Sequence, residues 1–314
     1  STRKESSAAS DVYKRQLFYL TKSKIYLVIS GIIIGLLILG TFQASLNLKG
    51  AESLFVEDKQ SDINFQKNIH KDYSISNNGN QSILNNATRY DYEQLNQANQ
   101  AISFVGFPQF IFKSYGMTII SLLAGFFGVL VANYDYKFGT FKRRLGQQSW
   151  KIILLGKSVG LVVSLIVMYL LIFSLAACSG EILHLFFKSE NAGEYGQSLY
   201  PLINSDSFYL LFFSFMIGLA LAMMCFALTL ASKRANLIGS AFMIYLFILP
   251  NTGCFDWSNM TLNIFAPFGN HLGVPPLSMT QISPLFILVL FVTYLLIILT
   301  GGMLIFFKHT RYNI

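Results

Sequence analysis

Charge is scarce in this sequence of 314 residues. Asp, Glu, Lys and Arg together make up 12% of it, against roughly 25% in an average soluble protein. A soluble fold of this size would need far more charge to cover its surface. Cysteine occurs three times and proline seven times, which excludes a disulfide scaffold, a collagen-like chain and a Pro-rich disordered chain. Apolar residues instead reach 53%, so the composition predicts an integral membrane protein.

The apolar residues lie in six blocks. Each block is close to the ~20 residues that a helix needs to cross ~30 Å of hydrocarbon, and a helix satisfies every backbone amide within the segment. We therefore expect an all-α integral membrane fold with six transmembrane helices and a polar extracellular insertion between the first two. The predicted spans are residues 25–46, 110–132, 152–178, 208–231, 237–255 and 285–307. Pro250 and Gly253 interrupt the fifth block, where a buried re-entrant turn would suit the same residues.

The distribution of Lys and Arg predicts the orientation. With six spans both termini share one side of the membrane, and that side carries 16 bases against three acids, or +13. The other side carries −5, which gives the net charge of +8. Because positive charge is retained in the cytoplasm, both termini are predicted to lie on the cytoplasmic face of a cell membrane. The basic charge indicates topology and contact with anionic lipid, and we expect no nucleic-acid partner.

The connections between the spans are unequal. On the cytoplasmic side we expect an amphipathic start at residues 1–24, a helical loop at 133–157, a turn at 232–236 and a tail at 308–314. On the outer side we expect segments at 47–109, 179–207 and 256–284, the last a compact cap. Residues 1–16 resemble translated adaptor sequence, and without them the inner side still carries +11.

The first outer segment, residues 47–109, contains ten Asn and seven Gln. With so few large aliphatic residues it is expected to lack a core of its own. Residues 77–80 predict a turn, and apolar side chains at helical spacing beyond it predict an amphipathic helix that leads back to the second span. This segment either caps the outer mouth or recognises a ligand, or it is a solvated loop; the sequence leaves both interpretations open.

The sequence predicts no catalytic, cofactor-binding or metal-binding residue. Its four histidines stand far apart, and none belongs to a pair with metal-ligand spacing. Gly156-Lys157-Ser158 resembles the end of a phosphate-binding loop, but Lys151 replaces the leading glycine and the tripeptide enters a membrane helix. We therefore expect no enzyme activity on this chain.

The cytoplasmic loop at 133–157 has a helical pattern of its own. Phe138, Phe141 and Leu145 recur at steps of three and four residues and form one apolar face, while basic residues 142–144 occupy the rest. The pattern fits a surface helix held by anionic lipid, and it also fits a docking helix for a cytoplasmic partner. The central parts of the spans contain no charged residue, which disfavours an ion-coupled carrier because such carriers keep charges for their coupling ion.

Together with the six predicted spans, Asp135, Gly139-Thr140, the basic run 142–144 and Lys157 make the chain similar to the permease subunits of ABC transporters of the ABC-2 family, although Trp150 stands where many members have Arg. The resemblance implies a coupling helix that docks on a separate ATPase subunit, which holds ATP and Mg²⁺, and a second permease chain in a homo- or heterodimer. The long first outer segment resembles permeases for peptide-antibiotic immunity or export in Gram-positive bacteria. The implied coupling residues are Asp135, Phe138, Gly139, Thr140, Phe141, Lys142, Arg143, Arg144, Leu145 and Lys157.

The expected function is therefore that of a membrane permease subunit in an ATP-driven exporter of an amphipathic peptide, an antibiotic or a lipid-like substrate. The alternative is a membrane sensor or scaffold that detects a ligand through its outer segment. The partner discriminates between them, because a soluble ATPase indicates the exporter, whereas a kinase or no partner indicates the sensor.

The charge asymmetry makes the orientation testable. In a chain without Cys254, a cysteine that replaces Asn78 should react with a membrane-impermeant thiol reagent in intact cells, because residue 78 is predicted to be external. A cysteine that replaces Gln147 should react only after the membrane is opened. Labelling at position 147 in sealed cells would contradict the six-span topology.

Overall fold

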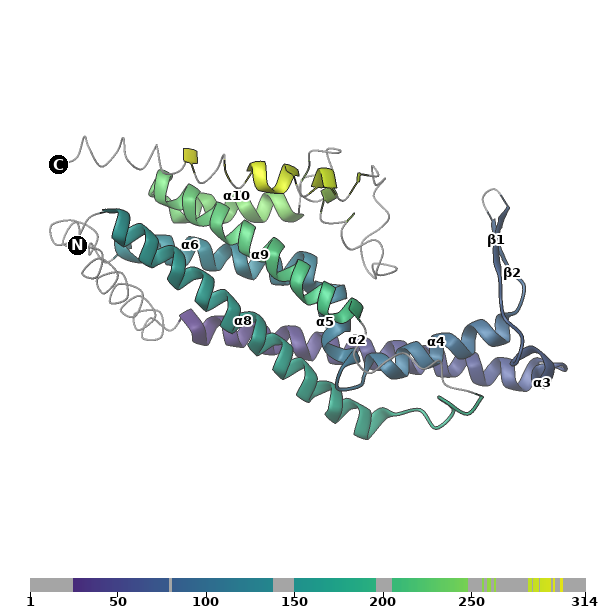
Figure 1. Ribbon diagram of the computed structural model, residues 1–314. Coiled ribbons are helices and arrows are strands. Elements are labelled where there is room, and N and C mark those ends of the chain that lie inside the picture. Colours follow the sequence, from purple (N-terminus) through teal and green to yellow (C-terminus); the bar gives the residue numbers. More distant parts are fainter. Residues whose placement is uncertain are drawn as a thin grey trace. The chain divides into compact units, whose positions relative to one another are not determined.

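The structure, a computed structural model, describes most of the chain. The described residues are 25–78, 81–137, 150–195, 205–247, 256, 259–260, 263, 282–283, 285–287, 289–294, 296 and 300–301. The chain divides into two compact units, which are treated separately below (Figure 1). Unit 1 comprises Ser1–Gly31, Phe112–Leu170 and Phe208–Ile314, and unit 2 comprises Ile32–Ile111 and Leu171–Ser207. The predicted amphipathic start and the C-terminal tail lie outside the described residues.

Three helices are long and apolar enough to cross a membrane. They are α2 (Ile25–Ser61), α8 (Trp150–Phe187) and α9 (Ser205–Ser232). Two shorter apolar helices, α10 (Ala235–Phe247) and Leu285–Tyr294, fall in the fifth and sixth predicted spans. The described residues thus have the helices of a membrane protein, with three candidate spans or four when a bent pair is counted. The full count of six and the side on which the termini lie stay predictions.

Two of the long helices continue well beyond the predicted spans. Helix α2 has 37 residues and α8 has 38, so at about 1.5 Å per residue each is far longer than the ~30 Å of a hydrocarbon core. The segments 47–61 and 179–187, expected to be loop, are therefore helical. Polar side chains alone do not end a helix. Residues 47–61 contain no Pro, and helix α2 continues through their single Gly, Gly50.

The second predicted span is broken rather than straight. Helix α5 (Gly106–Tyr115) is followed by a π-helical turn, η1 (Gly116–Ile120), and then by α6 (Ser121–Lys137). The two helical parts are bent by 73° about this break. A π-turn misplaces backbone hydrogen bonds, and the Ser121 hydroxyl donates to the Gly116 carbonyl at 2.9 Å. The side chain thereby satisfies a backbone acceptor at the bend.

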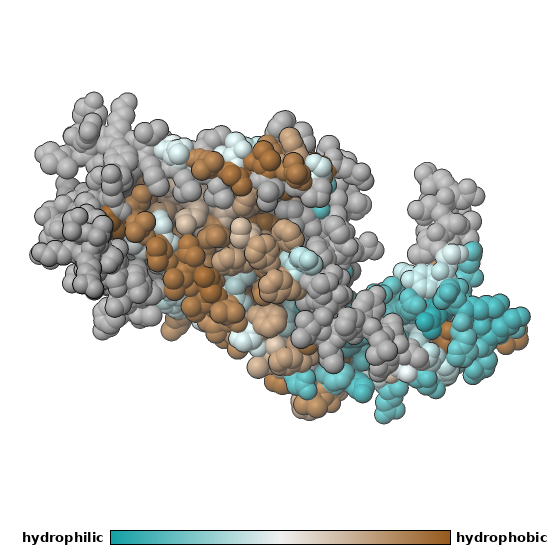
Figure 2. All heavy atoms as spheres, in the orientation of Figure 1, coloured by the Kyte–Doolittle hydropathy of each residue, from teal (hydrophilic) through white to brown (hydrophobic). Residues whose placement is uncertain are grey.

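The core of unit 1 forms where α6, α9 and α10 pack together. Phe242 of α10 lies against Gly125 of α6, and Gly128 of α6 lies against the backbone of Ala222 in α9. A Cβ atom at either glycine would collide with these neighbours, so the two glycines allow the close approach of the helices. Figure 2 shows hydrophobic side chains gathered on the surface of α8 and α9 in this unit, where Leu170 is 59% exposed.

Close approach at Gly128 makes a substitution there informative. Gly128→Ala should lower the thermal unfolding midpoint of the purified protein by an amount equivalent to about 1–3 kcal/mol, because the added methyl group meets the Ala222 carbonyl and cannot be accommodated by a side-chain shift. Gly35→Ala is the matched control, since nothing lies within 4 Å of its Cβ position, and it should be neutral or slightly stabilising. Equal midpoints for the two variants would contradict the α6–α9 contact.

Candidate functional site

The predicted coupling residues are only partly described. Helix α6 ends at Lys137 and α8 begins at Trp150, and Asp135 lies in the last turn of α6. The remaining loop residues, Phe138, Gly139, Thr140, Phe141, Lys142, Arg143, Arg144 and Leu145, lie outside the described part of the chain. Lys157 is the one predicted coupling residue whose side chain the structure describes.

Lys157 joins the two helices that flank the loop. Its side chain is 1% exposed, and its Nζ donates to the carbonyl oxygen of Ala132 in α6 at 3.4 Å. A charged amine among membrane helices is costly, roughly 2.5–3.5 kcal/mol at the helix centre, and such residues usually have a role. The contact links the second turn of α8 to the last two turns of α6, on either side of residues 138–149.

Unit 2 contains a folded polar head, which we define as residues 52–101 and 188–195. The rings of Phe55, Phe65, Tyr92 and Tyr195 form an aromatic cluster in it, with centroids 5.4–6.5 Å apart. Phe55 and Tyr92 are fully buried. The expectation that residues 47–109 lack a core is therefore wrong, because aromatic rings supply the buried area that aliphatic residues would otherwise provide.

The predicted helix of this segment is present, whereas residues 79 and 80 of the predicted turn lie outside the described part of the chain. Strands β1 (Ile75–Asn78) and β2 (Gln81–Leu84) form an antiparallel hairpin in which Asn78 pairs with Gln81. This hairpin adds two short strands to a fold expected to be all-α. Helix α4 (Ala87–Ala101) follows, with Leu95 and Ile102 buried as its periodicity predicts.

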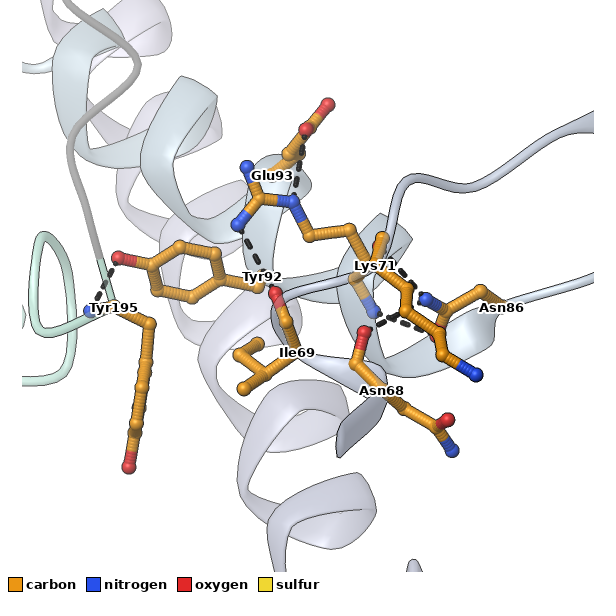
Figure 3. A network of polar contacts seen from close by, with 8 residues as sticks. Asn68, Ile69, Lys71, Asn86, Tyr92, Glu93 and Tyr195 are labelled. Carbon is orange, nitrogen blue, oxygen red and sulfur yellow. Dashed lines mark hydrogen bonds and ion pairs between the residues drawn. The ribbon is translucent and has the colours of Figure 1, made fainter. Parts of the chain in front are cut away.

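Asparagine side chains organise the start of α4 (Figure 3). Asn86 caps the helix by accepting from the Arg89 N–H, while its own amide donates to the Asn68 and Lys71 carbonyls at 2.8 and 2.9 Å. Asn68 belongs to the short helix α3 (Phe65–Asn68). The high Asn content thus satisfies backbone groups of the polar head, a role in which Asn is favoured at helix starts and turns.

Residues 189–195, which we call the strap, lie on α2 and α4. The backbone N–H groups of Ser189, Gly193 and Tyr195 donate to Asn99 Oδ1, Asn96 Oδ1 and the Tyr92 hydroxyl at 3.2, 3.0 and 2.9 Å. Figure 3 shows the last of these bonds. The Ser189 hydroxyl donates to Glu52, and Lys59 pairs with Glu194 at 3.0 Å.

Two carboxyl groups meet across the α2–α4 contact. Burial and the neighbouring Asp58 carboxyl raise the pKa of Asp91 to about 6. Asp58 Oδ2 is buried and accepts no hydrogen bond from the described residues. In contrast, three donated hydrogen bonds, from Asn68, Thr88 and the Asn64 backbone, lower the pKa of Asp62.

Sequence patterns do not reveal the strap or the aromatic cluster. Tyr195 lies 103 positions from Tyr92 and Ser189 lies 90 from Asn99, so no local periodicity connects them. The nearest signal is the i, i+4, i+7 spacing of Tyr92, Asn96 and Asn99, which puts three acceptors on one helix face. Among the described residues no group of three His, Cys, Asp or Glu side chains could hold a metal ion.

Comparison with known proteins adds no family to this description. No protein-family model, curated protein or solved structure matches the chain.

The Asp58–Asp91 contact predicts a pH-dependent stability. Because the folded-state pKa of Asp91 lies near 6, above its usual 3.8, the folded state holds a proton that the unfolded chain has released. The stabilising contribution of Asp91 should therefore be fully present below about pH 4 and should be lost as the pH rises through 6, whereas the lowered pKa of Asp62 contributes with the opposite sign at low pH. Asp91→Asn should raise the unfolding midpoint at pH 7.5, by an equivalent of about 1 kcal/mol because the group is partly solvated, and should flatten the profile between pH 4 and 7.

Asp72→Asn is the control, since it removes one negative charge from an exposed position of the same segment. Thermal unfolding of the purified full chain at pH 4.5 and 7.5 measures both variants. The same response in the two variants would mean that net charge, rather than the carboxyl contact, sets the pH dependence.

Proposed function

We propose that this chain is the membrane permease subunit of an ATP-driven ABC exporter, with the ATP-hydrolysing site on a separate subunit. The observation that carries the proposal is the burial of Lys157 against the Ala132 carbonyl. A docking loop can transmit force only if both of its ends are held. This contact holds together α6 and α8, the helices on either side of residues 138–149. Those residues belong to the loop with the ABC-2 pattern.

A route from this loop into the membrane helices supports the proposal. At Gly125 and Gly128, α6 packs so closely against α10 and α9 that an added Cβ atom would collide with them. Tightly packed interfaces move as rigid pieces rather than deform continuously. A displacement of the loop would therefore be passed through α6 to α9 and α10.

The surface of unit 1 also suits an amphipathic or lipid-like substrate. A groove of about 230 Å³ between α8 and α9 is lined by apolar surface only. Tyr169 forms part of it, is fully buried, and donates from its hydroxyl to the Ser214 carbonyl at 2.8 Å. The remaining lining residues are Ile166, Leu170, Phe208, Leu211, Phe212 and Phe215. Such a surface offers contacts to hydrocarbon and none to a polar solute.

A second candidate function, a membrane sensor, is favoured by one observation. The polar head has its own aromatic core and a defined surface, as a ligand-recognition domain requires. Copurification distinguishes the two candidates: a soluble ATPase that remains bound to this chain indicates the exporter, and a kinase indicates the sensor.

The coupling proposal is tested at Phe141. Phe141→Ala should leave membrane insertion and dimerisation intact but should reduce substrate-stimulated ATP hydrolysis by the partner at least tenfold, because a buried aromatic anchor can be worth about 2 kcal/mol or more at an interface. Lys142→Gln and Arg143→Gln should matter less and should mainly change the salt dependence. The assay is ATP hydrolysis in reconstituted membranes that contain both subunits.

The alternative role of this loop, a helix held by anionic lipid, predicts the reverse order. The basic residues would then dominate, and Phe141→Ala would weaken only surface attachment. Normal ATPase stimulation in Phe141→Ala and in a double Phe138→Ala/Leu145→Ala variant would rule out the coupling-helix assignment.

A further inference from the structure

The strap is bound to α4 through its backbone. Three of its N–H groups donate to side chains of α4, namely Asn99, Asn96 and Tyr92. These acceptors are spaced i, i+4 and i+7 and therefore share one face of the helix. Because the bonds are made to backbone N–H groups, they read the shape of a chain and not its sequence. Any polypeptide in the same conformation could make them.

Two side chains add selectivity at one end of the strap. Glu194 accepts from Lys59 of α2 at 3.0 Å. The Tyr195 ring lies among Phe55, Phe65 and Tyr92, in edge-on contact with Phe65 at 5.4 Å, and the Lys59 ammonium lies 5.5 Å from its centroid. The site thus accommodates an acidic residue directly followed by an aromatic one.

We propose that the trough between α2 and α4 is a peptide-binding site, which the strap of this chain occupies in the structure. By the trough we mean the residues of α2 and α4 that contact the strap, which are Glu52, Phe55, Lys59, Tyr92, Asn96 and Asn99. Its ligand is a polypeptide that presents a turn followed by an acidic–aromatic pair. This inference concerns the polar head alone and does not rest on the proposed transport function.

For the site to bind another peptide, the strap must leave it. The Lys59 and Glu194 side chains are 35% and 44% exposed, and ion pairs in that setting contribute little. Its advantage over a free ligand is its covalent connection, which gives a tethered segment an effective concentration in the millimolar range. A free peptide should therefore bind well only when the contacts of the strap are removed.

The test uses a fluorescent peptide of residues 188–196 and the purified full chain in lipid nanodiscs. The strap-released variant is Glu194→Gln/Tyr195→Ala, which removes the ion pair and the ring. Fluorescence anisotropy should show at least tenfold tighter binding of the peptide to this variant than to the unmodified chain. A control peptide with alanine in place of Tyr195 should bind at least tenfold more weakly.

A second substitution assigns the binding to the trough. Asn99→Ala in the strap-released background should weaken peptide binding several-fold, because it removes an acceptor for a backbone N–H. Gln97→Ala is the matched control, since Gln97 lies on the same helix and is exposed. Hydrogen exchange of α4 verifies that the polar head stays folded in each variant.

Three outcomes would overturn the proposal. The first is equal affinity of the peptide for the unmodified and strap-released chains, and the second is equal affinity of the two peptides. The third is the absence of binding at millimolar peptide, whether or not α4 stays protected from hydrogen exchange. The strap would then be an integral part of the polar head rather than the occupant of a site.

Discussion

Hydrocarbon offers no hydrogen-bond partner to a peptide group, and the rest of this structure depends on that constraint. Helices α2, α8 and α9 satisfy their amides internally. Where the second predicted span departs from regular helix, at Gly116–Ile120, the Ser121 hydroxyl takes up a backbone carbonyl. The same constraint applies to charge: the ammonium of Lys157, which is almost fully buried, lies against the Ala132 carbonyl. At these two positions, irregular backbone and a buried charge each have a specific partner.

The polar head is stabilised differently from the long apolar helices. Its surface is polar, and its buried area comes from the rings of Phe55, Phe65 and Tyr92 together with two aliphatic side chains, Ile69 and Leu95. Phe55 and Tyr92 contact each other at 5.4 Å between centroids, and their surroundings are completed by Tyr195 from a distant part of the sequence. Asn side chains then satisfy the backbone groups that short helices and turns leave without partners. The high Asn content, which in the sequence suggests a solvated loop, therefore stabilises the polar head through hydrogen bonds to its backbone.

The two candidate roles of this chain are located in different units. The proposed coupling function rests on unit 1, where Lys157 and the glycines of α6 hold helices in close contact. The inferred peptide site rests on the strap and the trough in unit 2. An exporter that handles amphipathic peptides would have use for both, but the physical arguments for them are independent.

The sequence by itself determined the membrane class, the approximate places of the long helices and helix α4, because hydropathy and periodicity are local properties. It did not determine where α2 and α8 end, since polar residues are compatible with a continuing helix. It also could not determine the π-turn at Gly116, which packs against Ser214 about a hundred residues away. Only the tertiary structure decided how the strap binds, because its hydrogen-bond partners are 90 to 137 positions away, and how Tyr195 completes the aromatic cluster. No local pattern encodes a contact between residues so distant in the chain.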